Sequence, residues 1–130
     1  MSMVAPFSAA ASDQAVLAVT LPVPSGQNIE LFEVLLDEVA GESWVRFRFI
    51  APNIGKHAGA VSYQQVEADF MHLCMTVVLP YMQEFDLTAD TVAVSLLDRP
   101  LDFGTTDPEA TQYIEIFRVA GDVCAWEEHW

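Results

Sequence analysis

The chain has 130 residues, of which 19 are Asp or Glu and 5 are Lys or Arg, so its formal net charge at pH 7 is −14. This length suits one domain, and 52% hydrophobic residues are enough for a core, which excludes a disordered acidic tail. The excess of acids argues against nucleic acids and anionic membrane surfaces as partners, because both require clustered cations. No run approaches the roughly 20 apolar residues of a membrane span, and the length excludes large cofactor-dependent enzymes.

The N-terminal residues 1–12 are small, apolar and uncharged. They resemble the end of a secretory signal, with residues 9–11 (three alanines) as a cleavage-like site. No Lys or Arg precedes Arg46, however, so the cationic start of such a signal is missing. Two interpretations remain: a signal-peptide remnant on an exported protein, or a disordered leader on a cytoplasmic one. We expect residues 1–15 to lie outside the fold and residues 16–130 to form a single domain.

Two strands are predicted in the first half, and residues 16–21 could add an edge strand. Residues 30–39 alternate between two faces with a period of two, which is typical of a strand. A turn at residues 41–43 leads into residues 44–51, which have strong β propensity. In that second strand Arg46 and Arg48 lie on the face opposite to the apolar side chains.

A helix is predicted after the loop of residues 52–60. Ser62 precedes Gln65 by three residues, which is the capping-box pattern. A single apolar stripe follows at helical spacing: Val66, Phe70, Leu73, Cys74, Val77 and Tyr81. Pro80 is expected to kink or end the helix near residues 78–79, with a short further turn to residue 85.

The second half predicts a central strand over residues 91–97 and a hairpin formed by residues 111–119 and 123–130. Between them, residues 98–109 form a turn-rich loop, in which Arg99 could neutralise nearby acids and Phe103 could anchor the loop to the core. The fold class is therefore α+β: an antiparallel sheet of five to six strands with one main helix packed on one face. The element order is β-β-β-α-β-β-β, or one strand fewer.

The two cysteines fall on surfaces that this packing would bring together. Cys74 lies on the apolar stripe of the helix, and Cys124 shares a strand face with Trp126. In an exported chain such a pair predicts a disulfide; in a cytoplasmic one they would be two buried thiols.

Asp69 and His72 could share a metal ion on the helix, but a solvated surface pair is commoner. No third ligand is spaced to join them, so we predict neither a metal nor a cofactor.

The C-terminal hairpin suggests a binding site. A two-residue turn would place Phe117 opposite Trp126 and Glu115 opposite Glu128, whereas a three-residue turn would place Glu115 opposite Glu127. Facing carboxylates need a cation, a shared proton or water, and Arg46 and Arg48 are the expected partners. Two interpretations remain: a site for a small polar ligand, or an ion-pair network of the same groups at the end of the sheet, which is the commoner arrangement. The ligand-binding candidates are Arg46, Arg48, Glu115, Glu128, Tyr113 and Trp126, with Trp130 at the rim.

Several short motifs resemble a family of small exported bacterial proteins of unknown function. They are Val34-Leu35-Leu36-Asp37-Glu38, Trp44-Val45-Arg46-Phe47-Arg48-Phe49, His72-Leu73-Cys74, Leu79-Pro80-Tyr81, Asp98-Arg99-Pro100, residues 103–113 and Cys124-Ala125-Trp126-Glu127. The resemblance covers about residues 22–130 and implies two cysteines and no established activity. Automated labels in that family sometimes read acetolactate synthase, but a thiamine-diphosphate enzyme needs a longer chain and a diphosphate-binding motif, neither of which is present here.

The sequence favours an exported, periplasmic or secreted domain that binds a protein or a small polar ligand without catalysis. One alternative is a small acid–base enzyme that uses Glu115, Glu128 and an arginine, because mutual repulsion raises the pKa of one carboxyl. Another is a cytoplasmic accessory subunit. No motif for a nucleophilic serine, a phosphate loop or a dinucleotide site is present. The sequence does not set the oligomeric state.

Overall fold

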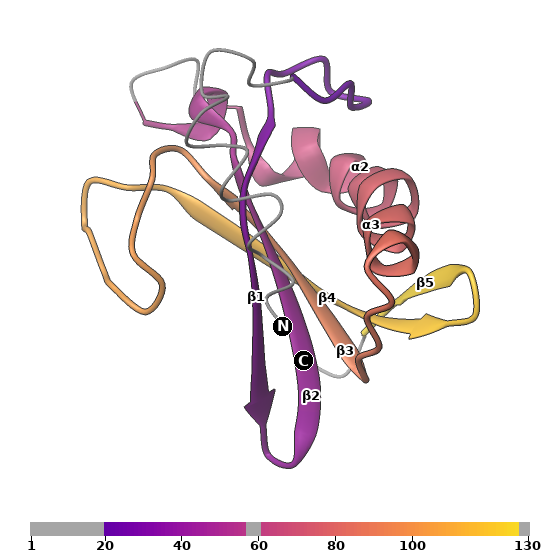
Figure 1. Ribbon diagram of the computed structural model, residues 1–130. Coiled ribbons are helices and arrows are strands. Elements are labelled where there is room, and N and C mark those ends of the chain that lie inside the picture. Colours follow the sequence, from indigo (N-terminus) through magenta and orange to yellow (C-terminus); the bar gives the residue numbers. More distant parts are fainter. Residues whose placement is uncertain (1–19, 57–60, 128–130) are drawn as a thin grey trace.

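A computed structural model of the protein describes residues 20–56 and 61–127. The fold is α+β, with one long helical segment packed on one face of a five-stranded sheet (Figure 1). In chain order the elements are β1 (Glu30–Val39), β2 (Glu42–Ile50), a 3-10 turn (Pro52–Ile54), α2 (Tyr63–Leu73), a π-helical turn (Cys74–Val78), α3 (Leu79–Glu84), β3 (Thr91–Leu97), β4 (Gln112–Ala120) and β5 (Val123–Trp126). The order is the predicted one with one strand fewer. Of the possible edge strand, residues 16–19 lie outside the described residues, and residues 20 and 21 are not in a strand.

The strands lie side by side in chain order, β1-β2-β3-β4-β5. Three neighbouring pairs are antiparallel, as predicted, but β2 and β3 are parallel. The difference arises because the chain returns from β2 to β3 through the helical segment, and such a crossover leaves both strands pointing the same way. All seven residues of β3 are buried, which confirms its central place in the sheet.

The predicted start of the helix is confirmed. The Ser62 side chain accepts a hydrogen bond from the backbone N–H of Gln65, and the Gln65 side chain accepts one from the backbone N–H of Ser62. This reciprocal capping satisfies two N–H groups that the first helical turn leaves without partners. The sequence therefore fixes where the helix begins.

The apolar stripe of the helix changes phase at the π-helical turn. Up to the first residue of the turn, the buried apolar side chains are those predicted: Val66, Phe70, Leu73 and Cys74. From the last residue of the turn onward, Val78 and Met82 are buried, whereas the predicted Val77 and Tyr81 are only partly buried. A π-helical turn contains an extra residue, which shifts the buried positions by one. Pro80 stands at the start of α3, where its missing N–H is tolerated, so the helical chain changes pitch there without ending.

The core lies between this helical segment and the sheet, around Phe47, Phe49, Phe70 and Phe117. A disulfide joins Cys74, at the start of the π-helical turn, to Cys124 in β5, with the two Cα atoms 6.3 Å apart. The predicted disulfide is therefore confirmed, and it ties the helix to the edge strand of the sheet.

Asp69 anchors the segment before β1 to the helix. Its carboxylate is fully buried and accepts hydrogen bonds from the backbone N–H of Ser25 (2.9 Å), the Ser25 hydroxyl (2.5 Å) and the Gln27 side-chain amide (2.9 Å). The prediction of a solvated pair with His72 is thus wrong for Asp69, because a partner 44 residues away in sequence covers it. Charged hydrogen bonds of this kind are stronger than neutral ones.

Replacing both cysteines by serine should lower the free energy of unfolding by about 4 kcal/mol, because the bond closes a loop of 50 residues in the unfolded chain. Urea unfolding of the oxidised protein and of the double variant measures this difference. Reduced wild-type protein should match the double variant. An unchanged urea midpoint would contradict a stabilising role for the bond.

Asp69→Ala should cost roughly 3 kcal/mol of unfolding free energy, because it leaves the buried Gln27 amide without an acceptor and removes a charged anchor. The matched control is Glu67→Ala, which removes an exposed carboxylate from the same helix. A loss at Asp69 no larger than the loss at Glu67 would show that the anchor carries little of the stability.

Candidate functional site

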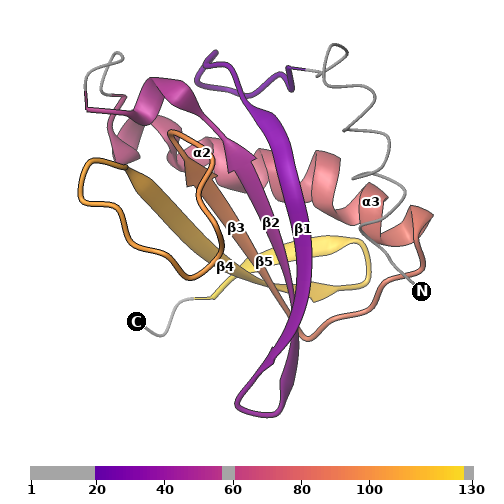
Figure 2. The same cartoon turned by 60° about the vertical axis from the view of Figure 1, so that its left-hand side comes forward.

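The sheet separates the candidate residues into two groups. Successive side chains of a strand point to opposite faces, so Val45 and Phe47 of β2 pack toward the helix while Arg46 and Arg48 point away from it. We call the sheet face opposite the helix the outer face. The loop of residues 98–111 folds back over this face (Figure 2), and its Phe103 reaches both arginines.

Arg46 is held by one carboxylate and two aromatic rings. Its Nε donates to both carboxylate oxygens of Asp37 at 3.2 and 3.3 Å. Its guanidinium carbon lies 4.8 Å from the centroid of the Trp44 ring and 4.9 Å from that of Phe103, which is within the range of cation–π attraction. The terminal nitrogens of Arg46 make no hydrogen bond to the described residues.

Arg48 forms a more enclosed ion pair, between its Nη1 and Glu33. Only 3% of the arginine side chain is exposed, although the outer face carries no helix. The rings of Phe32 and Phe103 lie 5.7 and 5.6 Å from its guanidinium carbon and help to cover it. A buried arginine needs such a partner, because an unpaired charge in this environment is costly.

Phe103 lies on the outer face, which corrects the prediction that it anchors the loop to the core. Its side chain is 52% exposed while it contacts both guanidinium groups. Ile114, 46% exposed, lies on the same face, because Arg48, Ser95 and Ile114 are in register across β2, β3 and β4. The outer face therefore displays two large apolar side chains beside a pair of arginines.

The loop that carries Phe103 is closed by ion pairs and hydrogen bonds. Arg99 pairs with Asp98 at 3.0 Å and with Asp107 at 3.8 Å, which confirms its predicted role as a counter-ion for nearby acids. Asp98 also accepts a hydrogen bond from the backbone N–H of Thr111 at 3.1 Å. These contacts tie both ends of the loop together.

Glu115 lies on the helix side of the sheet, so the structure does not bring it together with Arg46 or Arg48. The hydroxyl of Tyr63, in the first turn of α2, donates a hydrogen bond to Glu115. Burial, this hydrogen bond and the negative charge of Glu115 raise the pKa of Tyr63 well above its ordinary value. Tyr113 packs edge-on against Tyr63, with ring centroids 5.6 Å apart. The carboxylate of Glu115 thus has a tyrosine as its partner where an arginine was predicted.

The hairpin register follows the predicted two-residue turn as far as it is described. Phe117 lies opposite Trp126 and Val119 opposite Cys124, and the rings of Phe117 and Trp126 stack with centroids 4.6 Å apart. Glu128 and Trp130 lie outside the described residues. An ion-pair network does form near this end of the sheet, but through Arg118, which contacts Glu42 and Glu127 at 3.1 and 3.2 Å.

Sequence reasoning missed Tyr63, Phe103, Glu33 and Asp37 as partners. The signal for the two acids was present, because alternation along residues 30–39 places Glu33 and Asp37 on one face, and the β1–β2 register sets them beside the arginines. Phe103 gave no such signal, since loop residues have no fixed face.

Among the described residues no group of three or more His, Cys, Asp or Glu side chains is placed to hold a metal ion. No helix in the same part of the chain is long and apolar enough to cross a membrane.

The chain belongs to a family of unknown function (DUF6497), whose model matches residues 3–129. This confirms the predicted resemblance to a family without an assigned function. The chain matches none of the curated proteins and none of the solved structures with which it was compared. The disulfide is compatible with an oxidising compartment outside the cytoplasm.

Tyr63→Phe should change how stability depends on alkaline pH. The folded state raises the pKa of Tyr63 above the unfolded value of about 10, so this contribution to stability is complete below that pH and is lost as the pH rises through the folded pKa. Urea unfolding between pH 8 and 12 should therefore show a steeper alkaline loss for the wild type than for Tyr63→Phe. Glu115→Gln should weaken the effect, and identical pH profiles for wild type and Tyr63→Phe would contradict it.

Proposed function

We propose that this member of the family is a non-enzymatic binding domain that recognises a protein partner through its outer face. The observation that carries this proposal is the placement of Phe103, which is half exposed and yet braced by two guanidinium groups. Ile114 extends the apolar area on the same face. Aromatic and arginine side chains are the groups that contribute most of the energy in protein interfaces.

The contacts of Phe103 support its role as a binding anchor. A side chain that is already ordered loses less conformational entropy when a partner covers it. Arg46 and Arg48 contact the side of the Phe103 ring that faces the sheet and limit its motion. The Arg99 ion pairs limit the motion of the loop that carries the ring. The exposed part of the ring remains available to a partner.

Charge indicates the chemistry of that partner. Arg46 and Arg48 are each neutralised by an acid, so the centre of the outer face carries little net charge. The loop of residues 98–111 beside it carries Asp98, Asp102, Asp107 and Glu109 against a single base, Arg99, in a chain with a net charge of −14. A basic segment with an apolar side chain at its centre would complement this surface and would be steered toward it. We therefore assign the partner to this class.

Localisation forms part of the same proposal. The disulfide supports an exported, periplasmic or secreted domain, because such bonds persist in oxidising compartments. The partner would then be met outside the cytoplasm. The alternative of a cytoplasmic accessory subunit would require this bond to survive in a reducing environment.

The proposal is tested with a short probe peptide that has two central leucines flanked by lysines, and with an identical peptide flanked by glutamates. Fluorescence or NMR titration should show saturable binding of the lysine peptide and chemical-shift changes on the outer face. Phe103→Ala should weaken this binding at least tenfold, because loss of an anchor costs about 2 kcal/mol or more. Far-ultraviolet circular dichroism verifies that the variant is folded.

Met75→Ala is the matched control, since it removes an exposed apolar side chain from the helix, on the other side of the sheet. Its affinity for the lysine peptide should equal that of the wild type. Preferential binding of the glutamate peptide would assign the face to acidic ligands, through the terminal nitrogens of Arg46, and would overturn the proposed partner class. Equal weakening by Phe103→Ala and Met75→Ala would refute the proposed site.

A further inference from the structure

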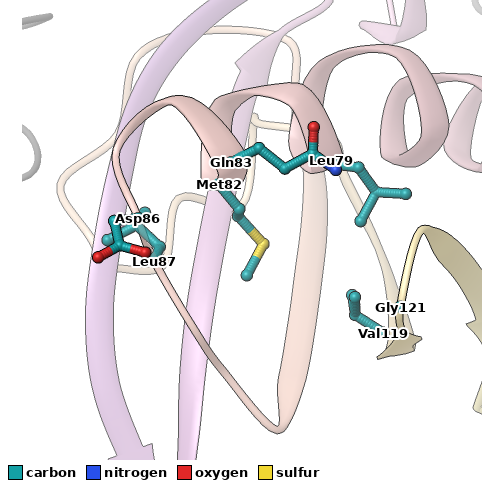
Figure 3. A pocket seen from close by; sticks show the side chains of 7 residues that line it. All are labelled: Leu79, Met82, Gln83, Asp86, Leu87, Val119 and Gly121. Carbon is teal, nitrogen blue, oxygen red and sulfur yellow. The ribbon is translucent and has the colours of Figure 1, made fainter.

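A second candidate site lies on the helix side of the sheet, between the end of α3 and the β4–β5 hairpin. It is a hollow of about 320 Å³, and Figure 3 shows the side chains that line it. Leu79, Met82, Leu87 and Val119 supply apolar surface, while Gln83 and Asp86 supply polar groups. We propose that this pocket binds a small amphipathic cation, an alkylammonium group with a short apolar tail.

The size and lining of the pocket favour a small ligand. Ligand pockets in proteins combine apolar surface with a few polar groups that fix orientation, and this volume is at the lower end of their range. Helical residues form one wall and Val119 the other (Figure 3). The apolar tail would lie between Met82 and Val119, with its head group near the polar residues.

Asp86 stands just past the end of α3, where the helix ends beside the pocket. The backbone N–H of Leu87 donates to the Met82 carbonyl (2.8 Å) and that of Asp86 to the Gln83 carbonyl (3.3 Å), which together end the helix in a Schellman motif. This motif places Asp86 in the left-handed region, with φ of 55°, where glycine is the favoured residue. Aspartate tolerates this region better than most residues do, and here its side chain lines the pocket.

Electrostatics favour a positive ligand at this end of the helix. Carbonyl groups at a helix C-terminus carry partial negative charge, and Asp86 adds a full one. The Asp86 side chain is exposed, and its carboxylate makes no hydrogen bond or ion pair with the described residues. No lysine or arginine lines the pocket. A cation bound there would gain from both the carboxylate and the helix end.

This proposal does not depend on the proposed partner site. The pocket is on the helix side of the sheet, and it is formed by residues that take no part in the outer face. A peptide bound over Phe103 would leave it open.

The test uses three probes of equal chain length: hexylamine, hexanol and hexanoate. In ¹H–¹⁵N NMR titrations of the oxidised protein, hexylamine should give saturable shifts at Leu87 and Val119. Its affinity should exceed that of hexanoate about fivefold, which is the upper range for a surface charge pair. Equal affinities for the three probes, or shifts that never saturate, would overturn the proposal.

Asp86→Asn removes the charge and keeps a residue that tolerates the left-handed conformation. It should bring the affinities for hexylamine and hexanol together, whereas Asp90→Asn, at an exposed acid outside the pocket, should preserve the preference for hexylamine. Asp86→Gly should likewise abolish the preference while raising the Tm by a few degrees, because glycine relieves the backbone strain. A preference that survives both changes at Asp86 would refute the assigned role of this carboxylate.

Discussion

The alternation of side chains along the strands decides which groups of this protein can meet. Phe47 of β2, Val94 of β3 and Glu115 of β4 are in register, so all three point toward the helix. Arg46 and Arg48 flank Phe47 and must therefore point the other way. No rotamer of a long side chain crosses a packed sheet, and a one-residue register slip would expose the core. The separation of Glu115 from the two arginines is thus imposed by the same pattern that builds the core.

The outer face of the sheet has no helix among the described residues to cover it, and other residues of the chain cover it instead. A central strand such as β3 is buried on both faces, yet the helix covers only one of them. On the other face β3 carries the small residues Ala93 and Ser95, and the arginine side chains of β2 extend beside them. Phe103 then lies over the guanidinium groups. The loop of residues 98–111 therefore acts as a partial second layer, which places a half-exposed aromatic ring on two guanidinium groups.

Local features of the sequence were enough to predict much of the fold. The alternation of residues 30–39 predicted β1 with its observed ends, and Ser62 with Gln65 predicted the first residue of α2. The parallel pairing of β2 with β3 and the Tyr63–Glu115 contact were not predictable in this way, because both depend on where the chain goes between distant segments. The grouping of Glu115 with Arg46 and Arg48 was wrong for the same reason, because charge alone does not say which face of the sheet a side chain takes without the register of three strands.

The π-helical turn links the disulfide at Cys74 to the candidate pocket beside Val119, because it lies between them along the helix. It begins at Cys74, where the disulfide fixes the helix to β5, and it changes which residues face the sheet from there on. With the extra residue, Tyr81 turns to pack edge-on against Phe47, while Met82 faces the hairpin. The changed pitch of the helix therefore decides which helical residues line the pocket beside Val119.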